Sequence, residues 1–96
     1  MAALTTVKVE VGTVFSALKI RATIDNLDDN SGFKYTDNKS FEHSFQLNPG
    51  NYMITISGMN QDGDSTDIWI TGNFIENRYA KADKPFYSKV FTGKVI

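Results

Sequence analysis

Cysteine is absent from this chain of 96 residues, and its absence excludes disulfide bonds, thiol nucleophiles and zinc sites built from cysteine. Long apolar runs are absent as well, since none approaches the roughly 20 residues that a membrane-spanning helix requires. Neither sign of charge dominates, because the formal net charge is -1 at pH 7. The fold must therefore be stabilised by packing alone. We expect one domain over residues 1–96, because the chain is long enough for a single core and too short for two.

Catalytic signatures are missing too. The sequence has a single histidine, His43, and it contains neither the Gly-x-Ser-x-Gly turn of serine hydrolases nor a phosphate-binding glycine-rich loop. His43 shares its parity along the sequence with Phe41 and Phe45, which places it on the apolar face of an alternating segment, where a hydrogen-bonded imidazole is the usual outcome. We therefore expect no enzyme, no cofactor and no catalytic residue.

Acidic residues are present, but they do not follow a metal-binding pattern. Asn60, Asp62 and Asp64 have the alternate spacing that begins an EF-hand loop, yet the glycine and the closing glutamate of that loop are missing. One interpretation is calcium held by Asp62, Asp64 and Asp67, or across to Asp25, Asp28 and Asp29; the other is an Asp-Gly turn of a β-hairpin. We favour the hairpin and expect no metal site.

The most informative segment that is present runs from Phe41 to Gly58, where two alternating apolar runs meet at a Pro-Gly pair. Apolar residues keep one parity before the pair and one parity after it, which is the pattern of half-buried β-strands. In the turn, Pro49 presets φ to about -65° and Gly50 can take the positive φ of a type II turn. Tyr52 then offers a ring to the core and a hydroxyl to a turn carbonyl, as the corner tyrosine of a β-sandwich does.

Alternation of this kind runs through most of the chain. Further candidate strands cover residues 6–11, 14–24, 33–36, 66–74 and 86–96, with turn-rich composition between them. Residues 75–79 either extend the preceding strand or begin a loop, residues 80–85 are expected to be irregular, and no segment has a sustained helical period with caps. About seven short strands predict an all-β fold, a single Greek-key β-sandwich of immunoglobulin-like or transthyretin-like type.

Residues 47–58, Leu-Asn-Pro-Gly-Asn-Tyr-Met-Ile-Thr-Ile-Ser-Gly, resemble the signature of transthyretin-like (prealbumin-like) domains: a leucine, a Pro-Gly pair, a tyrosine and alternating apolar residues that end at a glycine. Carboxypeptidase regulatory-type and Cna B-type modules belong to this group. The resemblance implies a compact sandwich used as a spacer, an adhesin or pilus repeat, a secretion-system component or, occasionally, a sugar-binding module. The Cna B-type isopeptide between a first-strand lysine and a last-strand asparagine cannot be placed here, because the last asparagine is Asn77.

Trp69, the sole tryptophan, is the best candidate for a binding residue. If the isoleucines on either side of it face the core, its indole faces outward beside Asp67 and Thr71, where it suits a sugar or a protein partner. Tyr79 and Tyr87 are expected to join this ligand- or partner-binding surface. The competing interpretation is that the segment after this strand covers the indole.

Charges are unevenly distributed along the sequence. Eight acidic and two basic residues fall between residues 25 and 67, whereas five basic and two acidic residues fall between 76 and 96. If the two groups form opposite poles of the fold, head-to-tail assembly is favoured. The alternative is that charges of both signs cover one solvated surface. Nucleic acid is not an expected partner, because the basic residues are mixed with acidic ones and no nucleic-acid-binding motif is present.

We therefore predict a non-enzymatic protein-interaction or structural assembly module of a cell envelope, appendage or secretion complex, which binds a protein partner or assembles with itself. The alternative is a carbohydrate-binding module that uses exposed aromatic residues around Trp69. The compartment stays open, because a chain without cysteine is compatible with either redox environment. An extracellular or envelope location is favoured if a signal peptide has been removed, since residues 1–4 do not begin one.

Overall fold

The computed structural model describes residues 3–12, 19–61, 63–75 and 78–96. In these residues the chain forms nine β-strands and no helix. The strands are β1 (Ala3–Val11), β2 (Ile20–Asn26), β3 (Gly32–Asp37), β4 (Phe41–Leu47), β5 (Gly50–Met59), β6 (Thr66–Gly72), β7 (Phe74–Ile75), β8 (Tyr79–Ala82) and β9 (Phe86–Val95). The first part of the candidate strand at 14–24 lies outside the described residues.

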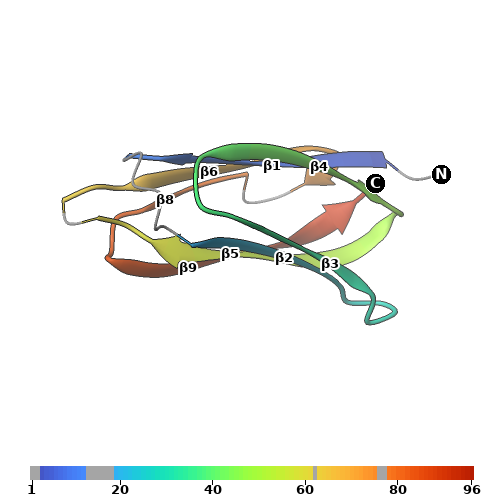
Figure 1. Ribbon diagram of the computed structural model, residues 1–96. Helices are drawn as coiled ribbons and strands as arrows, with labels where there is room; N and C mark the ends of the chain where they lie inside the picture. Colours follow the sequence, from blue (N-terminus) through green and yellow to red (C-terminus); the bar gives the residue numbers. More distant parts are fainter. Residues whose placement is uncertain (1–2, 13–18, 62, 76–77) are drawn as a thin grey trace.

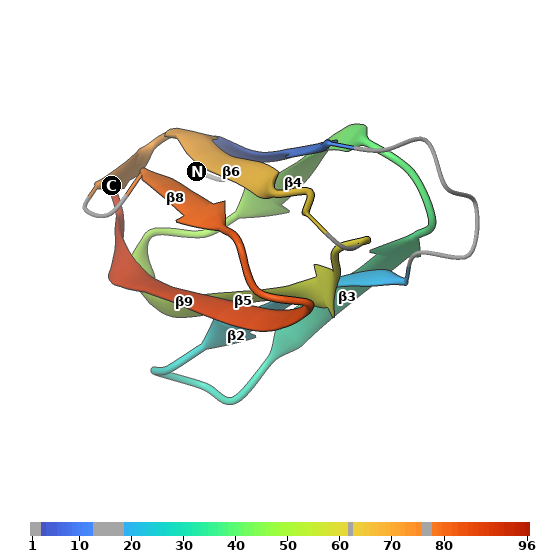
Figure 2. The same cartoon turned by 90° about the vertical axis from the view of Figure 1, so that its left-hand side faces the viewer.

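The strands form two antiparallel sheets that pack face to face (Figure 1). One sheet has four strands in the order β4-β1-β6-β8, and the other has five in the order β3-β2-β5-β9-β7. Viewed from the end of the sandwich, β8 and β9 lie on one side, and β3 and β4 lie on the other (Figure 2). The predicted all-β sandwich is confirmed. The expectation of irregular structure over residues 80–85 is wrong for residues 80–82, because they belong to β8 and pair with β6, whereas residues 83–85 lie outside the strands.

Alternation along the strands places apolar side chains between the two sheets. The largest fully buried side chains are Phe74, Phe91, Ile20, Ile24, Leu47, Ile54, Ile56, Ile68, Ile70, Val7, Val9 and Val95. They come from both sheets and form one core. Ile54 and Ile56 have the inward parity predicted for the second run of the Pro-Gly segment, and Ile68 and Ile70 have the inward parity predicted around Trp69.

The Asp-Gly pair between β5 and β6 does not make the hairpin that the sequence favours. β5 belongs to the five-stranded sheet and β6 to the four-stranded sheet, so this connection crosses from one layer to the other. Gly63 has φ +81°, so the turn does use the glycine, while Asp62 lies outside the described residues. An Asp-Gly pair predicts that the chain reverses its direction. Such a reversal can join two paired strands of one sheet or, as between β5 and β6, strands of two different sheets.

The Pro-Gly corner likewise crosses between layers, because it joins β4 to β5. Tyr52 is 3% exposed, and its hydroxyl donates a hydrogen bond to Asn48 O at 2.8 Å, so the predicted corner tyrosine is confirmed. Asn26 Nδ2 donates to the same hydroxyl at 3.2 Å. Gly50 has a positive φ of +155°. This angle is far from the roughly +80° of a type II turn, so the turn type is not the predicted one.

Hydrogen bonds of Asn60 link several elements at the other end of the sandwich. Its side-chain amide donates to Ala82 O at 2.9 Å and to Lys84 O at 2.8 Å. Its Oδ1 accepts the hydroxyl of Thr66 at 2.5 Å, and its backbone N–H donates to Pro85 O at 2.9 Å. Asn60 is buried, so one side chain satisfies buried polar groups of β6 and β8 and a partly buried carbonyl of the β8–β9 loop.

Aromatic rings close the side of the sandwich at which β3 and β4 lie. Tyr35 packs against Phe41 with ring centroids 4.8 Å apart and stacks on His43 at 4.2 Å. Phe45 continues the row, 4.8 Å from His43 and 6.0 Å from Phe33. His43 therefore lies half-buried among aromatic rings, on the apolar side that its parity predicts.

Candidate functional site

The outer surface of the four-stranded sheet carries most of the residues singled out from the sequence. Pairing of β1 with β6 and of β6 with β8 puts Lys8, Trp69 and Tyr79 in one row across the sheet. Ile68 and Ile70 are both 0% exposed. Because side chains alternate along a strand, the indole between them points away from the core, as the sequence predicts.

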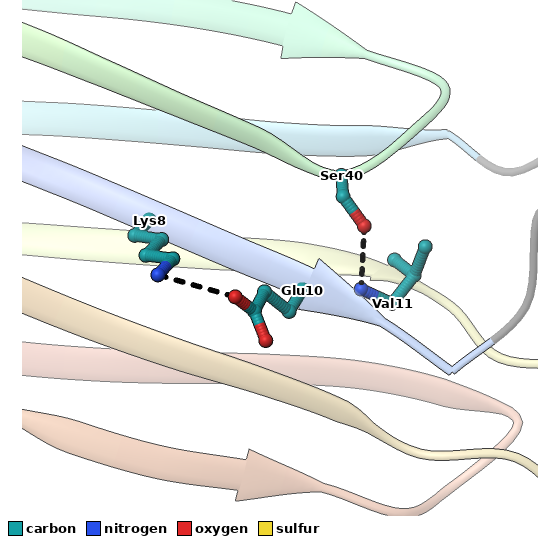
Figure 3. Close-up of polar contacts among 4 residues, drawn as sticks. All are labelled: Lys8, Glu10, Val11 and Ser40. Carbon is teal, nitrogen blue, oxygen red and sulfur yellow. Dashed lines mark hydrogen bonds and ion pairs between the residues drawn. The ribbon is translucent and has the colours of Figure 1, made fainter.

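Neighbouring side chains flank the indole of Trp69. Lys8 Nζ lies 5.4 Å from the centroid of the ring, and Glu10 Oε1 holds this ammonium group at 3.1 Å (Figure 3). The ring of Tyr79 lies 5.4 Å away at an angle of 44°. The indole is half-buried as a result. Both interpretations of the sequence hold in part, because Trp69 faces outward and Tyr79 of β8 covers some of it.

A hydrogen bond links Tyr79 to the acid beside Trp69. The Tyr79 hydroxyl donates to Asp67 Oδ1 at 2.6 Å, and this bond raises the pKa of the phenol. The ring of Tyr79 remains 51% exposed. Thr71 lies further along β6, exposed and across from Thr6 of β1. We call Lys8, Asp67, Trp69, Thr71 and Tyr79 the Trp69 face.

Tyr87 does not join the Trp69 face, and its assignment to that surface is wrong. It belongs to β9 of the other sheet and is 7% exposed. It shares its parity with the buried Phe91, so its ring lies between the sheets. Burial raises the pKa of Tyr87; the nearby Thr66 hydroxyl acts in the opposite direction, although the phenol makes no hydrogen bond of good geometry.

Charges of both signs are mixed on the described surface. Lys81 of β8 lies across from Asp67 of β6, and Lys94 of β9 lies across from Asn51. Asn51 donates its backbone N–H and its side-chain amide to Asp28 at 3.0 and 3.2 Å. These bonds lower the pKa of Asp28, and Lys94 adds to the effect. The acidic and basic groups of the sequence therefore do not form opposite poles among these residues.

A second candidate site is the free edge of β9. β5 pairs with β9 along its whole length, whereas β7 pairs only with Lys94 and Val95. No other strand in the described part of the chain pairs with β9, so the stretch from Phe86 to Thr92 has an open side. Figure 2 shows β9 at the side of its sheet, with β8 in the layer above it. We call residues 86–92 the β9 edge.

Backbone groups on the β9 edge are directed outward at alternate residues. Ile96 N donates to Asn73 O, beside β7, and therefore points away from β5. The register of β9 with β5 is continuous, so this direction recurs at every second residue. Ser88 and Val90 thus present N–H and C=O groups to the open side.

The side chains of the β9 edge combine exposed apolar groups with one inward charge. Phe86 is 75% exposed and Val90 is 54% exposed. Lys89 has the inward parity of Tyr87 and Phe91 and is half-buried. A charged residue that points inward on an edge strand discourages indiscriminate pairing with other chains. The β9 edge is therefore open to pairing, and the inward charge of Lys89 limits which strands can pair with it.

Other classes of site are not supported by the described residues. They contain no group of three or more His, Cys, Asp or Glu side chains placed to hold a metal ion. Asp62, one of the ligands of the calcium interpretation, lies outside them. No helix in the same residues is long and apolar enough to cross a membrane.

The fold defines the chain as an all-β protein of two packed antiparallel sheets. Comparisons with protein-family models, with curated proteins and with solved structures find no match to it. The resemblance of residues 47–58 to transthyretin-like domains stays a prediction. The Trp69 face and the β9 edge are two surfaces of the described residues that have features of a binding site.

Proposed function

We propose that this chain is a non-enzymatic protein-interaction module whose partner adds a β-strand to the β9 edge. The observation that carries the proposal is the open side of β9, where Ser88 and Val90 present unpaired backbone groups next to exposed apolar side chains. Strand addition uses such groups, because main-chain hydrogen bonds supply affinity and alternate side chains supply specificity.

Lys89 defines the kind of strand that fits. An added strand places one of its side chains against Lys89 on the inner side of the sheet, where the ammonium group is half-buried. An acidic residue at that position pairs with the charge, whereas an apolar one leaves it desolvated and alone, which is costly. The partner segment is thus extended, apolar on its outer face and acidic at one inward position. Its setting, a cell envelope, appendage or secretion complex, rests on the family resemblance.

The experiment is a selection of displayed random ten-residue peptides on the immobilised protein, followed by affinity measurement on variants. We expect the selected peptides to alternate in polarity and to contain Asp or Glu. Val90→Pro removes an outward N–H without removing a bond to β5, so we expect the variant to fold. Peptide affinity should fall about tenfold or more, since a buried backbone hydrogen bond is lost.

Val90→Ala is the matched control, because it shortens the same side chain and keeps the N–H. It should lose less affinity than Val90→Pro. Ser88→Pro provides a second test at an equivalent position if Val90→Pro does not fold. Peptides that bind the proline variants as tightly as the unmodified protein would contradict strand addition, and so would a selection that enriches no peptide.

We propose carbohydrate binding at the Trp69 face as the second candidate function. Its support is the half-exposed ring of Tyr79 beside the indole, with the Asp67 carboxylate within 2.6 Å of the phenol. A sugar ring stacks on an aromatic face while its hydroxyls bind adjacent polar groups. The rest of the face, Lys8 and Thr71, supplies further polar groups.

A glycan array followed by fluorescence quenching tests this second function. A glycan that binds should shield Trp69 from acrylamide, and Tyr79→Ala should weaken its binding about fivefold to tenfold, the worth of one aromatic contact. Phe86→Ala, which removes an exposed ring of the other sheet, is the control and should change nothing. Array binding that does not protect the indole, or no binding at all, counts against the Trp69 face as a sugar site.

A further inference from the structure

A hollow of about 780 Å³ lies across one end of the five-stranded sheet. Its lining comes from the start of β2, the end of β3, the end of β5 and the start of β9, which are neighbours in the sheet. The volume is within the range of roughly 300–1,000 Å³ that small-molecule sites occupy. No residue of the Trp69 face lines the hollow, and of the β9 edge only Phe86 and Tyr87 do.

The wall on the β5 and β9 side is apolar. Met59 and Phe86 are cross-strand partners there, and Phe86 has the most exposed side chain among the exposed large hydrophobic residues. The ring of Tyr87 continues the wall inward. Gly58 makes room for it, because a Cβ at that position would lie 2.6 Å from the Tyr87 hydroxyl. An apolar surface next to a depression is what a non-polar ligand group requires.

The wall on the β2 and β3 side is positively charged. Lys19 and Arg21 both line the hollow and both are exposed. In the part of the chain that the structure describes, neither takes part in an ion pair. Asp37 also lines this wall, so two cations face one anion and the net charge of the wall is positive. The Asp37 carboxylate accepts the Tyr35 hydroxyl at 3.0 Å and the Asn38 backbone N–H at 2.7 Å. The two cations are therefore available to a ligand.

We propose that this hollow binds a small amphipathic anion, with its apolar body against Phe86 and Met59 and its carboxylate between Lys19 and Arg21. Apolar and cationic walls on opposite sides of one depression fit a molecule that carries both characters, and they fit a neutral or purely ionic molecule less well. The hollow shares Phe86 and Tyr87 with the β9 edge, whereas Ser88 and Val90, whose backbone groups serve strand addition, do not line it.

The experiment is a titration of the ¹⁵N-labelled chain with octanoate, and separately with the neutral 1-octanol, followed by amide chemical shifts. Octanoate should shift the amides of Ile20, Gly58 and Phe86, and octanol should bind more weakly. Arg21→Gln should reduce octanoate affinity about fivefold, which is the scale of a solvent-exposed ion pair, and should leave octanol binding unchanged. Phe86→Ala should weaken both ligands.

Matched control variants distinguish binding in the hollow from non-specific binding elsewhere on the protein. Lys34→Gln removes a cation from the same sheet outside the hollow, and Val90→Ala shortens an exposed apolar residue of the same strand outside it. Neither should change octanoate affinity. Shifts scattered over the whole chain, equal binding of octanoate and octanol, or an unchanged affinity in Arg21→Gln would each overturn the proposal.

Discussion

Replacing Tyr52 with alanine should lower the free energy of unfolding by about 3–5 kcal/mol, the cost of removing a buried aromatic ring. The ring is 3% exposed in the core, and the hydroxyl is bonded to Asn48 O and to Asn26 Nδ2. Chemical denaturation measures the change. The exposed Tyr79→Ala is the control and should cost about 0.5–1.5 kcal/mol.

Two further variants measure how much the Tyr52 hydroxyl and the backbone at Gly50 each contribute to the stability of this corner. Tyr52→Phe keeps the ring and loses the hydroxyl, so it should cost about 1–2 kcal/mol, in proportion to the hydrogen bonds removed. Gly50→Val should cost about 1–3 kcal/mol, because a β-branched residue resists a positive φ and its Cβ would lie 2.8 Å from Asp28 Oδ2. A loss below roughly 1 kcal/mol for Tyr52→Ala would mean that the ring does not support the core.

The alternation of apolar and polar residues was sufficient to predict the fold class. This pattern indicates which face of a strand is buried, wherever that strand lies in its sheet. The corner tyrosine followed from residues a few positions apart, and the outward direction of Trp69 followed from its two isoleucine neighbours. Each of these properties depends on short-range geometry. For the same reason, alternation correctly separated Ile54 and Ile56 from the half-buried Thr55 between them.

Partner choice between strands could not be predicted, because it depends on contacts between residues distant in sequence. The Asp-Gly pair could not show that β5 and β6 belong to different sheets. The assignment of Tyr87 to the Trp69 face failed because β9 belongs to the other sheet and Tyr87 faces the core, and which strands share a sheet is not visible in the pattern of either strand. The extent of the β9 edge could not be predicted for a related reason: an open side is a property of the neighbouring strands, not of the strand's own residues.

Asn60 is the polar residue whose replacement should lower the stability of the fold most. The sequence suggested an oxygen ligand of a weak EF-hand pattern, whereas the structure uses the whole side chain to bind Ala82 O, Lys84 O and the Thr66 hydroxyl. Asn60→Ala leaves these buried groups without partners, and it should lower the free energy of unfolding by about 3–4 kcal/mol, roughly one per hydrogen bond. The exposed Asn38→Ala is the control and should stay within about 0.5 kcal/mol.

Asn60→Asp tests whether the two donated hydrogen bonds account for that cost. The substitution preserves shape but replaces the amide donor with a carboxylate oxygen that faces two carbonyl oxygens, so at pH 7 it should be at least as damaging as Asn60→Ala. Burial and the carbonyl dipoles raise the pKa of the new carboxyl in the folded state above its unfolded value. The folded state then binds more protons, and the stability lost at pH 7 is partly regained as the pH falls through that raised pKa. Denaturation at pH 7 and pH 5 measures how far the free energy of unfolding of each variant lies below that of the unmodified protein. This difference should be smaller at pH 5 than at pH 7 for Asn60→Asp, and it should not change for Asn60→Ala. Equal differences at both pH values would mean that the side chain acts by filling space and not by donating to Ala82 and Lys84.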